Sequence, residues 1–507
     1  MAAHDFTIYD FICRSAQIYS QRTSFVYKNT RIDYGQFKKK CDRLADGLIK
    51  AGIEKGDRLG ILAYNCLDYM VLFGAAAKIG AIMLPINWRL QKDEVTYILN
   101  DCTPKIIFAG PDFQGLMKEI SYHLEFIKKC YTVDTTDKVD GFLNFEDLYS
   151  EEIGREVFDI SADTGFLIIH TAAASGRPRG ALLSQANIVY ANLDMISNFQ
   201  LSPDDCNIGI LPFSHIAGLI MTAVLLHAGG KNVILEKFDP ELACRLIDRE
   251  KGTIFFDFAP ILQMIMDRFR EGKYNFSSLR HVAGLNSAEN INNFLKRVPQ
   301  AKYWTGYGQT EAMWISSCRF DERPGCAGKP SKLARLALFD DYEREVPTGK
   351  SGEICIRSPI VFLGYWNLPL DNEYTFRNGW HHTGDIGRFD EDGYLWYQKR
   401  KAEKELIKSG GENVYPAEVE KAILEHEAVF ETCVFGVPDP DWGEAIKSIC
   451  VLSPGKSIEP QEIIDFVATK IARYKKPKYL VILDSLPHND TGEIDREQVK
   501  KDHGANY

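Results

Sequence analysis

The sequence lacks the patterns that mark secreted, membrane-spanning and zinc-ribbon proteins. Its twelve cysteines are scattered and form no C-x-x-C pair, so neither a zinc ribbon nor a redox motif is indicated. The first residues, MAAHDFTIYDFICRSAQ, contain no cationic stretch followed by an apolar run, so no signal peptide is expected. The longest apolar run, residues 216–228, is interrupted and too short to cross a bilayer. These absences predict reduced thiols and a cytoplasmic protein.

An excess of positive charge is also missing. The net charge of the 507 residues is −10, so nucleic acid is not expected as the main partner and any basic site must be local. Hydrophobic residues make up 45% of the chain and charged residues 26%, which is ordinary for a globular protein. At this length a single core is not expected, and the chain should form two or more domains.

Short apolar runs alternate with helical patterns in the first half of the chain. The apolar residues between Phe37 and Ile49 recur at spacings of three and four, which predicts a helix facing a core. Residues 71–79 predict a second helix, and strands are expected at residues 58–64, 82–86, 106–109, 166–169, 207–211 and 232–235. This alternation predicts an α/β domain of several layers with mainly parallel sheets.

The segment FLIIHTAAASGRPRGALLSQAN, residues 166–187, predicts a strand, a loop of small residues, a basic turn and the entry to a helix. Its loop reads Thr171-x-x-x-Ser175-Gly176-x-Pro178-Arg179-Gly180, where backbone N–H groups and arginines favour an anion. The frame resembles the phosphate loop of adenylate-forming enzymes, the acyl- and aryl-CoA synthetases and their relatives. Alanines at 172–174 stand where the family usually has Ser, Gly and Thr, and Arg179 stands where it has Lys.

Later motifs continue this resemblance in the family's order. Tyr307-Gly308-Gln309-Thr310-Glu311 matches the adenine and magnesium segment, with Tyr307 against the base, Thr310 at the α-phosphate and Glu311 as the Mg²⁺ ligand. Asp385 in GWHHTGD matches the residue that accepts both ribose hydroxyls, and Arg400 matches the ribose-binding arginine. Gly284 and Leu285 lie at the segment that borders adenine and the acyl pocket.

Two further segments are interpreted through the same resemblance. LPFSHIAG places His215 at the start of the helix that lines the acyl pocket, and residues 87–90 with Glu94 are expected to pack against the sheet. Lys408, Ser409, Gly410 and Gly411 match the glycine loop that faces the site during thioester formation, and so are expected to contact CoA. Pro416 should lie in the first turn of the following helix.

The end of the chain departs from the family. LPHNDTGEIDR matches the family's Leu-Pro-x-x-x-x-Gly-Lys-x-x-Arg, so Glu493 replaces the lysine that contacts the substrate carboxylate and α-phosphate during adenylation. This reversal of charge predicts an impaired first half-reaction.

The resemblance covers essentially the whole chain and implies an AMP-binding domain, residues 1–399, and a mobile C-terminal lid, residues 400–507. The expected activity is that of an AMP-forming acid–thiol ligase, which joins a fatty or aromatic carboxylic acid to CoA with ATP and Mg²⁺. The sequence is also compatible with a homodimer. Three other functions remain alternatives: a luciferase-like oxygenase, a carrier-protein-loading domain, and an AMP- or acyl-CoA-binding protein without full turnover.

Overall fold

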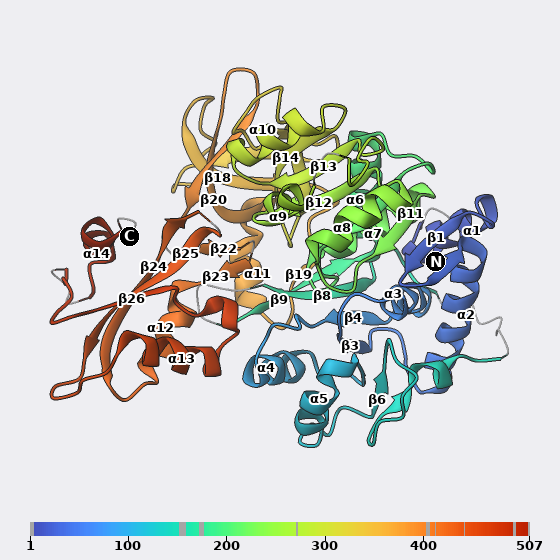
Figure 1. Cartoon of the computed structure of the whole chain (residues 1–507), viewed down its shortest axis with the longest axis horizontal. Coiled ribbons are helices and arrows are strands. Elements are labelled where there is room, and N and C mark those ends of the chain that lie inside the picture. Colours follow the sequence, from blue (N-terminus) through green and yellow to red (C-terminus); the bar gives the residue numbers. More distant parts are fainter. Residues whose placement is uncertain are drawn as a thin grey trace.

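The computed structural model describes residues 5–151, 159–171, 177–269, 272–401, 406–410, 412–440, 442–489 and 493–504. These residues form a large N-terminal domain and a small C-terminal domain, both α/β (Figure 1). Within the described residues, no helix combines the length and the apolar character needed to cross a membrane.

Two large sheets carry the N-terminal domain. Among the described residues, one sheet has nine strands in the order β16 (Lys329–Pro330), β15 (Met313–Arg319), β14 (Lys302–Gln309), β13 (His281–Leu285), β12 (Ile254–Phe258), β10 (Cys206–Gly209), β11 (Lys231–Ile234), β1 (Thr23–Tyr27) and β2 (Thr30–Asp33). The other has eight: β19 (Gly364–Tyr365), β9 (Arg179–Ser184), β8 (Gly165–Thr171), β4 (Ile82–Pro85), β3 (Arg58–Leu62), β5 (Ile106–Ala109), β6 (Lys129–Thr132) and β7 (Leu143–Asn144). The inner pairs are parallel and antiparallel pairs lie toward the edges, so the prediction of mainly parallel sheets is confirmed.

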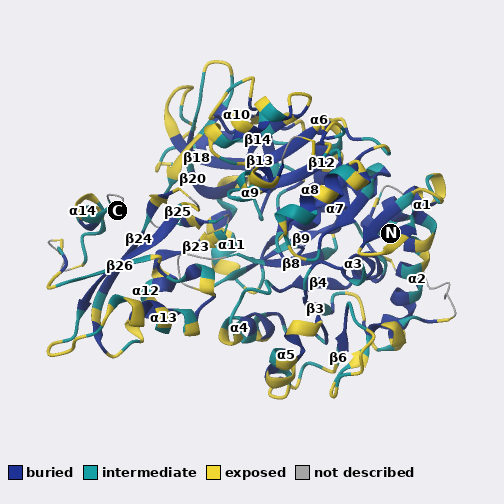
Figure 2. Cartoon of the chain, in the orientation of Figure 1, coloured by how far each residue is buried: buried dark blue, intermediate teal, exposed yellow. Residues whose placement is uncertain are grey.

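Helices fill the space between these sheets and cover their outer faces. One buried cluster joins side chains of both sheets with those of α1 (Ile8–Ile18), α2 (Tyr34–Lys50), α3 (Leu67–Ile79), α6 (Gln185–Phe199) and α7 (Ile216–Ala228). Helices α3 and α7 are buried on nearly all sides, which explains why their sequences are apolar all round. The remaining helices of this domain are α4 (Lys92–Cys102), α5 (Gln114–Ser121), α8 (Pro240–Glu250), α9 (Ile261–Arg268), α10 (Ala288–Arg297) and α11 (Pro369–Thr375). Figure 2 shows the buried strands at the centre of the molecule and the exposed residues at its rim.

An antiparallel sheet follows and leads to the small domain. It contains β17 (Arg335–Phe339), β18 (Ser351–Arg357), β20 (His381–Phe389) and β21 (Leu395–Arg400). The small domain has strands β23 (Glu412–Val414), β22 (Ile407–Ser409), β25 (Gly443–Leu452) and β24 (Val429–Asp439), with β26 (Tyr479–Leu483) parallel to β25, and helices α12 (Pro416–Leu424), α13 (Pro460–Lys470) and α14 (Arg496–His503). Pro416 opens α12, as expected from its fixed φ.

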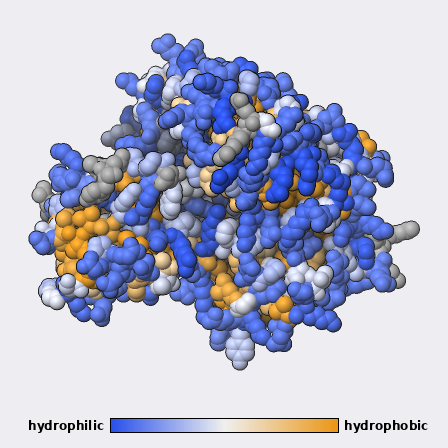
Figure 3. All heavy atoms as spheres, viewed as in Figure 1, coloured by the Kyte–Doolittle hydropathy of each residue, from blue (hydrophilic) through white to orange (hydrophobic). Residues whose placement is uncertain are grey.

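One detail differs from the sequence-based expectation, and a second was not predicted. The chain does not pass from the phosphate loop through a turn into a helix, because Arg179–Ser184 forms strand β9, antiparallel to β8. The small domain also leaves apolar side chains at its surface: all five residues of β26 are half-buried and Phe430 is 65% exposed. Figure 3 shows apolar side chains gathered where Figure 1 places this part of the domain.

Candidate functional site

A cavity of about 660 Å³ lies between the two domains and is called the central cavity below. Its walls begin where strands end: Thr171 closes β8, Phe258 closes β12, Leu285 closes β13 and Gln309 closes β14. Ligand sites in parallel sheets lie at the carboxyl ends of the strands. The small domain supplies the opposite wall through Lys408, Asn413, Tyr415, Trp442, Gly443 and Glu444.

The side chains of Tyr307, Gln309 and Arg400 converge on the carboxylate of Asp385, which is 1% exposed. The Tyr307 hydroxyl donates to Asp385 Oδ2 at 2.5 Å, and Gln309 Nε2 donates to the same oxygen at 2.6 Å. Arg400 Nε lies 2.8 Å from Asp385 Oδ1, but the geometry leaves that oxygen without a hydrogen bond among the described residues. Burial raises the pKa of the Tyr307 phenol, so the ring stays neutral. A buried acceptor of this kind fits the hydroxyl groups of a ribose.

A second chain of contacts connects Glu311 with Arg179. The Tyr365 hydroxyl donates to Glu311 Oε1 at 2.8 Å and accepts from Arg179 Nη2 at 3.2 Å. The Arg179 guanidinium also stacks on the Tyr365 ring, 4.0 Å from its centre, and pairs with Asp371 at 2.9 Å. A single carboxylate at the cavity wall fits Mg²⁺, because this ion takes most of its ligands from water and substrate phosphates.

The opposite end of the central cavity is apolar and aromatic. Ile216, Ala217 and Ile220 of α7 line it together with Phe256, Phe258 and Trp314. The Trp314 ring lies over Gly306, where a Cβ would come 2.5 Å from Trp314 Cζ2. The centres of the Trp314 and Phe256 rings are 5.6 Å apart. A bulky indole at this point limits the depth available to an elongated ligand.

His215 stands at the start of α7 and borders this apolar end. Its Nδ1 accepts from the backbone N–H of Ala217 at 3.2 Å, so the proton of the neutral ring is on Nε2. Burial lowers the pKa of His215. The imidazole is therefore neutral at neutral pH, and among the described residues no carboxylate orients it as a general base.

The small domain closes the cavity with the segment around Lys408. The backbone N–H of Lys408 donates to Glu444 Oε2 at 2.7 Å, and its ammonium lies 5.1 Å from the centre of the Tyr397 ring. Gly410 has φ +57, a left-handed conformation that glycine adopts at little cost. Of the predicted CoA contacts, Lys408 lines the cavity, whereas Ser409 and Gly410 lie behind it.

Glu493 is not among the residues that line the central cavity. It lies exposed on the loop between β26 and α14, where its backbone N–H donates to Asn489 Oδ1 at 3.0 Å. Asn489 N–H donates in return to the Glu493 carbonyl at 2.8 Å. In the arrangement described here the Lys408 segment therefore faces the cavity and the Glu493 segment does not.

Lys475 and Arg89 form ion pairs that join the small domain to the large one, and sequence reasoning did not assign them this role. Lys475 Nζ lies 2.6 Å from Glu94 Oε1 of the large domain and 2.5 Å from Glu418 Oε1 of its own domain. Arg89 pairs with Glu412. The segment around Arg89 and Glu94, interpreted as packing on the sheet, thus also forms the face that receives the small domain.

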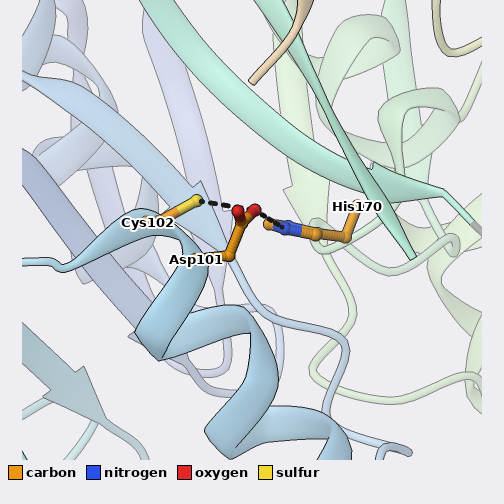
Figure 4. Close-up of side chains that lie close together, drawn as sticks. All are labelled: Asp101, Cys102 and His170. Carbon is orange, nitrogen blue, oxygen red and sulfur yellow. Dashed lines mark hydrogen bonds and ion pairs between the residues drawn. The ribbon is translucent and has the colours of Figure 1, made fainter. Parts of the chain in front are cut away.

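Two groups among the described residues bring three potential metal ligands within 4.8 Å of one another. In the first, His170 Nε2 lies 3.0 Å from Asp101 Oδ2, and Cys102 lies beside them (Figure 4). His170 Nδ1 has no acceptor among the described residues, whereas a metal-bound imidazole usually donates its second N–H. We interpret this group as a hydrogen-bonded contact that anchors the end of β8 to α4.

The second group is Glu353, Cys355 and His382. Lys401 and Arg377 each lie 3.1 Å from Glu353 Oε2. With two cations beside it, the Glu353 carboxylate has little attraction for a metal ion. Glu311, the predicted Mg²⁺ ligand, belongs to neither group.

The structure brings most of the predicted site residues to one place. Those that line the central cavity are Thr171, Arg179, His215, Leu285, Tyr307, Gly308, Gln309, Thr310, Glu311, Asp385, Arg400 and Lys408. Gly180 and Gly284 lie behind its wall, and a Cβ at Gly284 would come 1.7 Å from the Asp257 carbonyl oxygen. Ser175, Gly176 and Gly411, and the alanines at 172–174, lie outside the described residues.

Comparisons with known proteins agree with this arrangement. The family model described as AMP-binding enzyme matches residues 12–366, and the model described as AMP-binding enzyme C-terminal domain matches residues 418–493. The chain is 30% identical to an indoleacetate–CoA ligase of Aromatoleum aromaticum, over 97% of each protein. It is 29% identical to a long-chain-fatty-acid–CoA ligase of Mycobacterium tuberculosis, over 94% of each.

A solved structure is similar over almost the same length. It is a double mutant of o-succinylbenzoate CoA synthetase from Bacillus subtilis, bound with a product analogue. The identity is 25% and the TM-score 0.85, with 97% of this chain and 98% of that one covered.

Proposed function

Because the chain belongs to the AMP-binding enzyme family and is an acid–thiol ligase of the acyl-CoA synthetase type, we propose that it activates an aromatic carboxylic acid with ATP and transfers the acyl group to CoA. One observation supports this proposal: a single cavity is lined by Asp385, by a group of aromatic residues and by Lys408, to which we assign the nucleoside, the acid and the thiol. We place the boundary between the AMP-binding domain and the lid after residue 399, just before Arg400.

The nucleotide has a place on the Asp385 side. Asp385 would accept the ribose hydroxyls, the Tyr307 ring would lie against adenine, and Arg400 would hold the carboxylate in place. Thr310 and Arg179 would approach the phosphates. Mg²⁺ held by Glu311 would neutralise phosphate charge when bound.

An aromatic acid fits the apolar end better than a long alkyl chain. Phe256, Phe258 and Trp314 offer ring faces and edges to a planar substrate, and the indole over Gly306 restricts the depth of the pocket. The indoleacetate–CoA ligase and the long-chain-fatty-acid–CoA ligase match this chain at nearly equal identity. The preference for an aromatic acid therefore rests on the residues of the cavity and not on sequence similarity.

The thiol would enter past the small domain. Lys408 and Trp442 border the cavity on this side, and a lysine ammonium can balance the charge of a departing AMP. We further propose that adenylation is the slower half-reaction, because Glu493 would bring a negative charge toward two anions when the lid rotates. At ~4 Å and an effective dielectric of about 20, one unit-charge pair amounts to roughly 4 kcal/mol.

The test is ATP–pyrophosphate exchange and CoA thioester formation with a panel of aromatic acids and of fatty acids of increasing length. We expect ATP-dependent thioester formation with aromatic acids, with release of AMP, and weak ATP–pyrophosphate exchange. Trp314→Gly should extend the accepted chain length, with Trp396→Gly, on an outer strand, as the matched control. Preference of the wild type for long-chain fatty acids would contradict the aromatic assignment. AMP binding without thioester from any acid would favour a binding protein instead.

A further inference from the structure

Two cysteine thiols meet at the wall of the central cavity. Cys318 lies near the end of β15, and Cys326 lies in the loop that leads to β16. Their sulfur atoms are 3.3 Å apart, and both side chains are 4% exposed. Cys326 lines the cavity, whereas Cys318 lies behind it. The catalytic roles proposed above use neither thiol.

The surroundings of Cys326 favour its thiolate. The thiols of Cys318 and Cys326 are hydrogen-bonded to each other, and the backbone N–H of Gly328 donates to Cys326 Sγ at 3.3 Å. The hydrogen bond with Cys318 lowers the pKa of Cys326 to about 7; burial opposes this effect, and the smaller contribution of the Gly328 N–H adds to it. The same hydrogen bond, together with burial, raises the pKa of Cys318. The Cys326 thiol is thus suited to react with an oxidant, and the Cys318 thiol to react with the oxidised Cys326.

The loop that carries Cys326 is fixed at several points. Ala327 N–H donates to the Leu395 carbonyl at 2.7 Å, and Leu395 N–H donates to the Gly328 carbonyl at 2.8 Å. The Ala327 side chain belongs to the same buried cluster as Tyr307. A change in the Cys326 backbone therefore reaches the residue proposed to lie against adenine.

We propose that Cys318 and Cys326 form a redox modification site, in which a peroxide joins them in a reversible disulfide that distorts the central cavity and lowers activity. The Cys326 thiolate attacks one peroxide oxygen and becomes a sulfenic acid, while the other oxygen leaves as hydroxide and takes a proton to form water. Cys318 then attacks the Cys326 sulfur, the S–O bond breaks, and the departing hydroxide takes the Cys318 proton to form a second water. Two thiols are oxidised and one hydrogen peroxide is reduced to two waters.

Only a small movement of the two sulfur atoms is needed to form the disulfide. A disulfide has an S–S distance of ~2.05 Å, so the two sulfurs approach by only about 1.2 Å relative to the 3.3 Å observed. The cavity gives a small oxidant access to Cys326 without unfolding. Displacements of this order at a catalytic wall can cost about tenfold to a hundredfold in rate.

The experiment treats the purified full chain with hydrogen peroxide at increasing doses and maps the thiols by mass spectrometry after trypsin digestion. Cleavage after Arg319 separates Cys318 from Cys326, so a peptide pair that stays joined until reduction identifies the bond. We expect this pair at doses that leave Cys355 reduced. Cys355 is buried beside His382, with 3.3 Å between Sγ and Nδ1, and Cys355→Ser is the control that should not affect the bond.

The effect on activity is measured on the same samples and rests on the proposed function. Thioester formation should fall about tenfold or more with the appearance of the joined peptides and return with dithiothreitol. Cys326→Ser, which removes the thiol that attacks the peroxide and leaves a side chain of similar size, should retain activity under the same doses. Absence of the joined peptides when other cysteines oxidise would overturn the site, whatever the protein's activity. Joined peptides with unchanged thioester formation would overturn its effect on the cavity.

Discussion

Lys475 of the small domain forms an ion pair with Glu94 of the large domain, with 2.6 Å between Nζ and Oε1 and side-chain exposures of 3% and 9%. Glu418 accepts from the same ammonium at 2.5 Å. Burial by itself lowers the pKa of Lys475, but the adjacent Tyr474 and the two carboxylates outweigh it, so this pKa lies above its usual value. The ammonium therefore stays charged, and the contact holds the small domain with the Lys408 segment toward the cavity.

Glu94→Gln should slow thioester formation more than adenylation. The amide keeps the shape of the side chain and can still accept from Gln91 N–H at the start of α4, but it no longer neutralises Lys475. Breaking a buried ion pair on one side costs roughly 3–5 kcal/mol, and part of that cost should appear as a fall of about tenfold or more in the second half-reaction, measured by single-turnover kinetics with supplied acyl-adenylate. The control is Lys456→Met, which removes an exposed pair with Glu427 inside the small domain. Equal losses in both half-reactions would argue against a role in lid position.

Asp385→Asn should weaken AMP binding by about 2 kcal/mol, because charge-assisted hydrogen bonds to the ribose become ordinary ones. The amide retains the Tyr307 contact, but it leaves Arg400 without a counter-charge. Calorimetric titration with AMP measures the change, and a thermal melt verifies the fold. Asp390→Asn is the matched control, since Asp390 lies at the turn of the same hairpin and pairs with Arg323. Unaltered AMP affinity in the Asp385 variant would reject the ribose role.

Glu493→Lys should raise the adenylation rate about tenfold or more and leave thioester formation nearly unchanged. The substitution replaces a repulsion by an attraction during adenylation alone, since Glu493 is exposed and outside the cavity when Lys408 faces it. Single-turnover assays of each half-reaction compare the variants. Glu497→Lys, an equal change of charge on the exposed face of nearby α14, controls for net charge. A wild type that adenylates as fast as it forms the thioester would mean that another residue supplies the positive charge.

Asp257→Asn should remove one part of the pH dependence of stability. Burial raises the pKa of Asp257 to about 6 in spite of hydrogen bonds from Tyr303 and Asn286. The folded protein thus binds this proton more tightly than the unfolded chain does, so stability falls as pH rises from about 4 to about 6. Denaturant unfolding of both proteins across this range should show the wild type losing up to about 3 kcal/mol relative to the variant. A constant difference would contradict the raised pKa.

Local patterns in the sequence were sufficient for much of the fold. Residues 106–109 form the expected strand, and residues 216–228 form an apolar helix. Segments this rich in apolar residues require burial wherever they are placed. Strand β9 was missed because it is held by hydrogen bonds to β8 across the phosphate loop, and strand pairing of this kind depends on partners more than on propensity.

The site was predictable to the extent that its residues sit in contiguous motifs. Tyr307, Asp385 and Arg400 were assigned separately, and the structure brings them together. The Lys475–Glu94 pair joins residues 381 positions apart, and the two thiols of β15 and its loop form no recognised spacing. Neither relationship is encoded in a local pattern, since each depends on which surfaces the folded chain brings together.

Arg400 has one neighbour on each side of the domain junction: Nε faces Asp385, and Nη1 donates to the Tyr415 hydroxyl of the small domain at 2.9 Å. A ligand that orders Asp385 and Arg400 therefore also favours the Tyr415 contact, and by thermodynamic reciprocity a docked small domain slows escape of that ligand. Product departure and domain rotation then become one coupled event. Once the thioester has formed, the lifetime of this junction would then set the rate at which AMP is released.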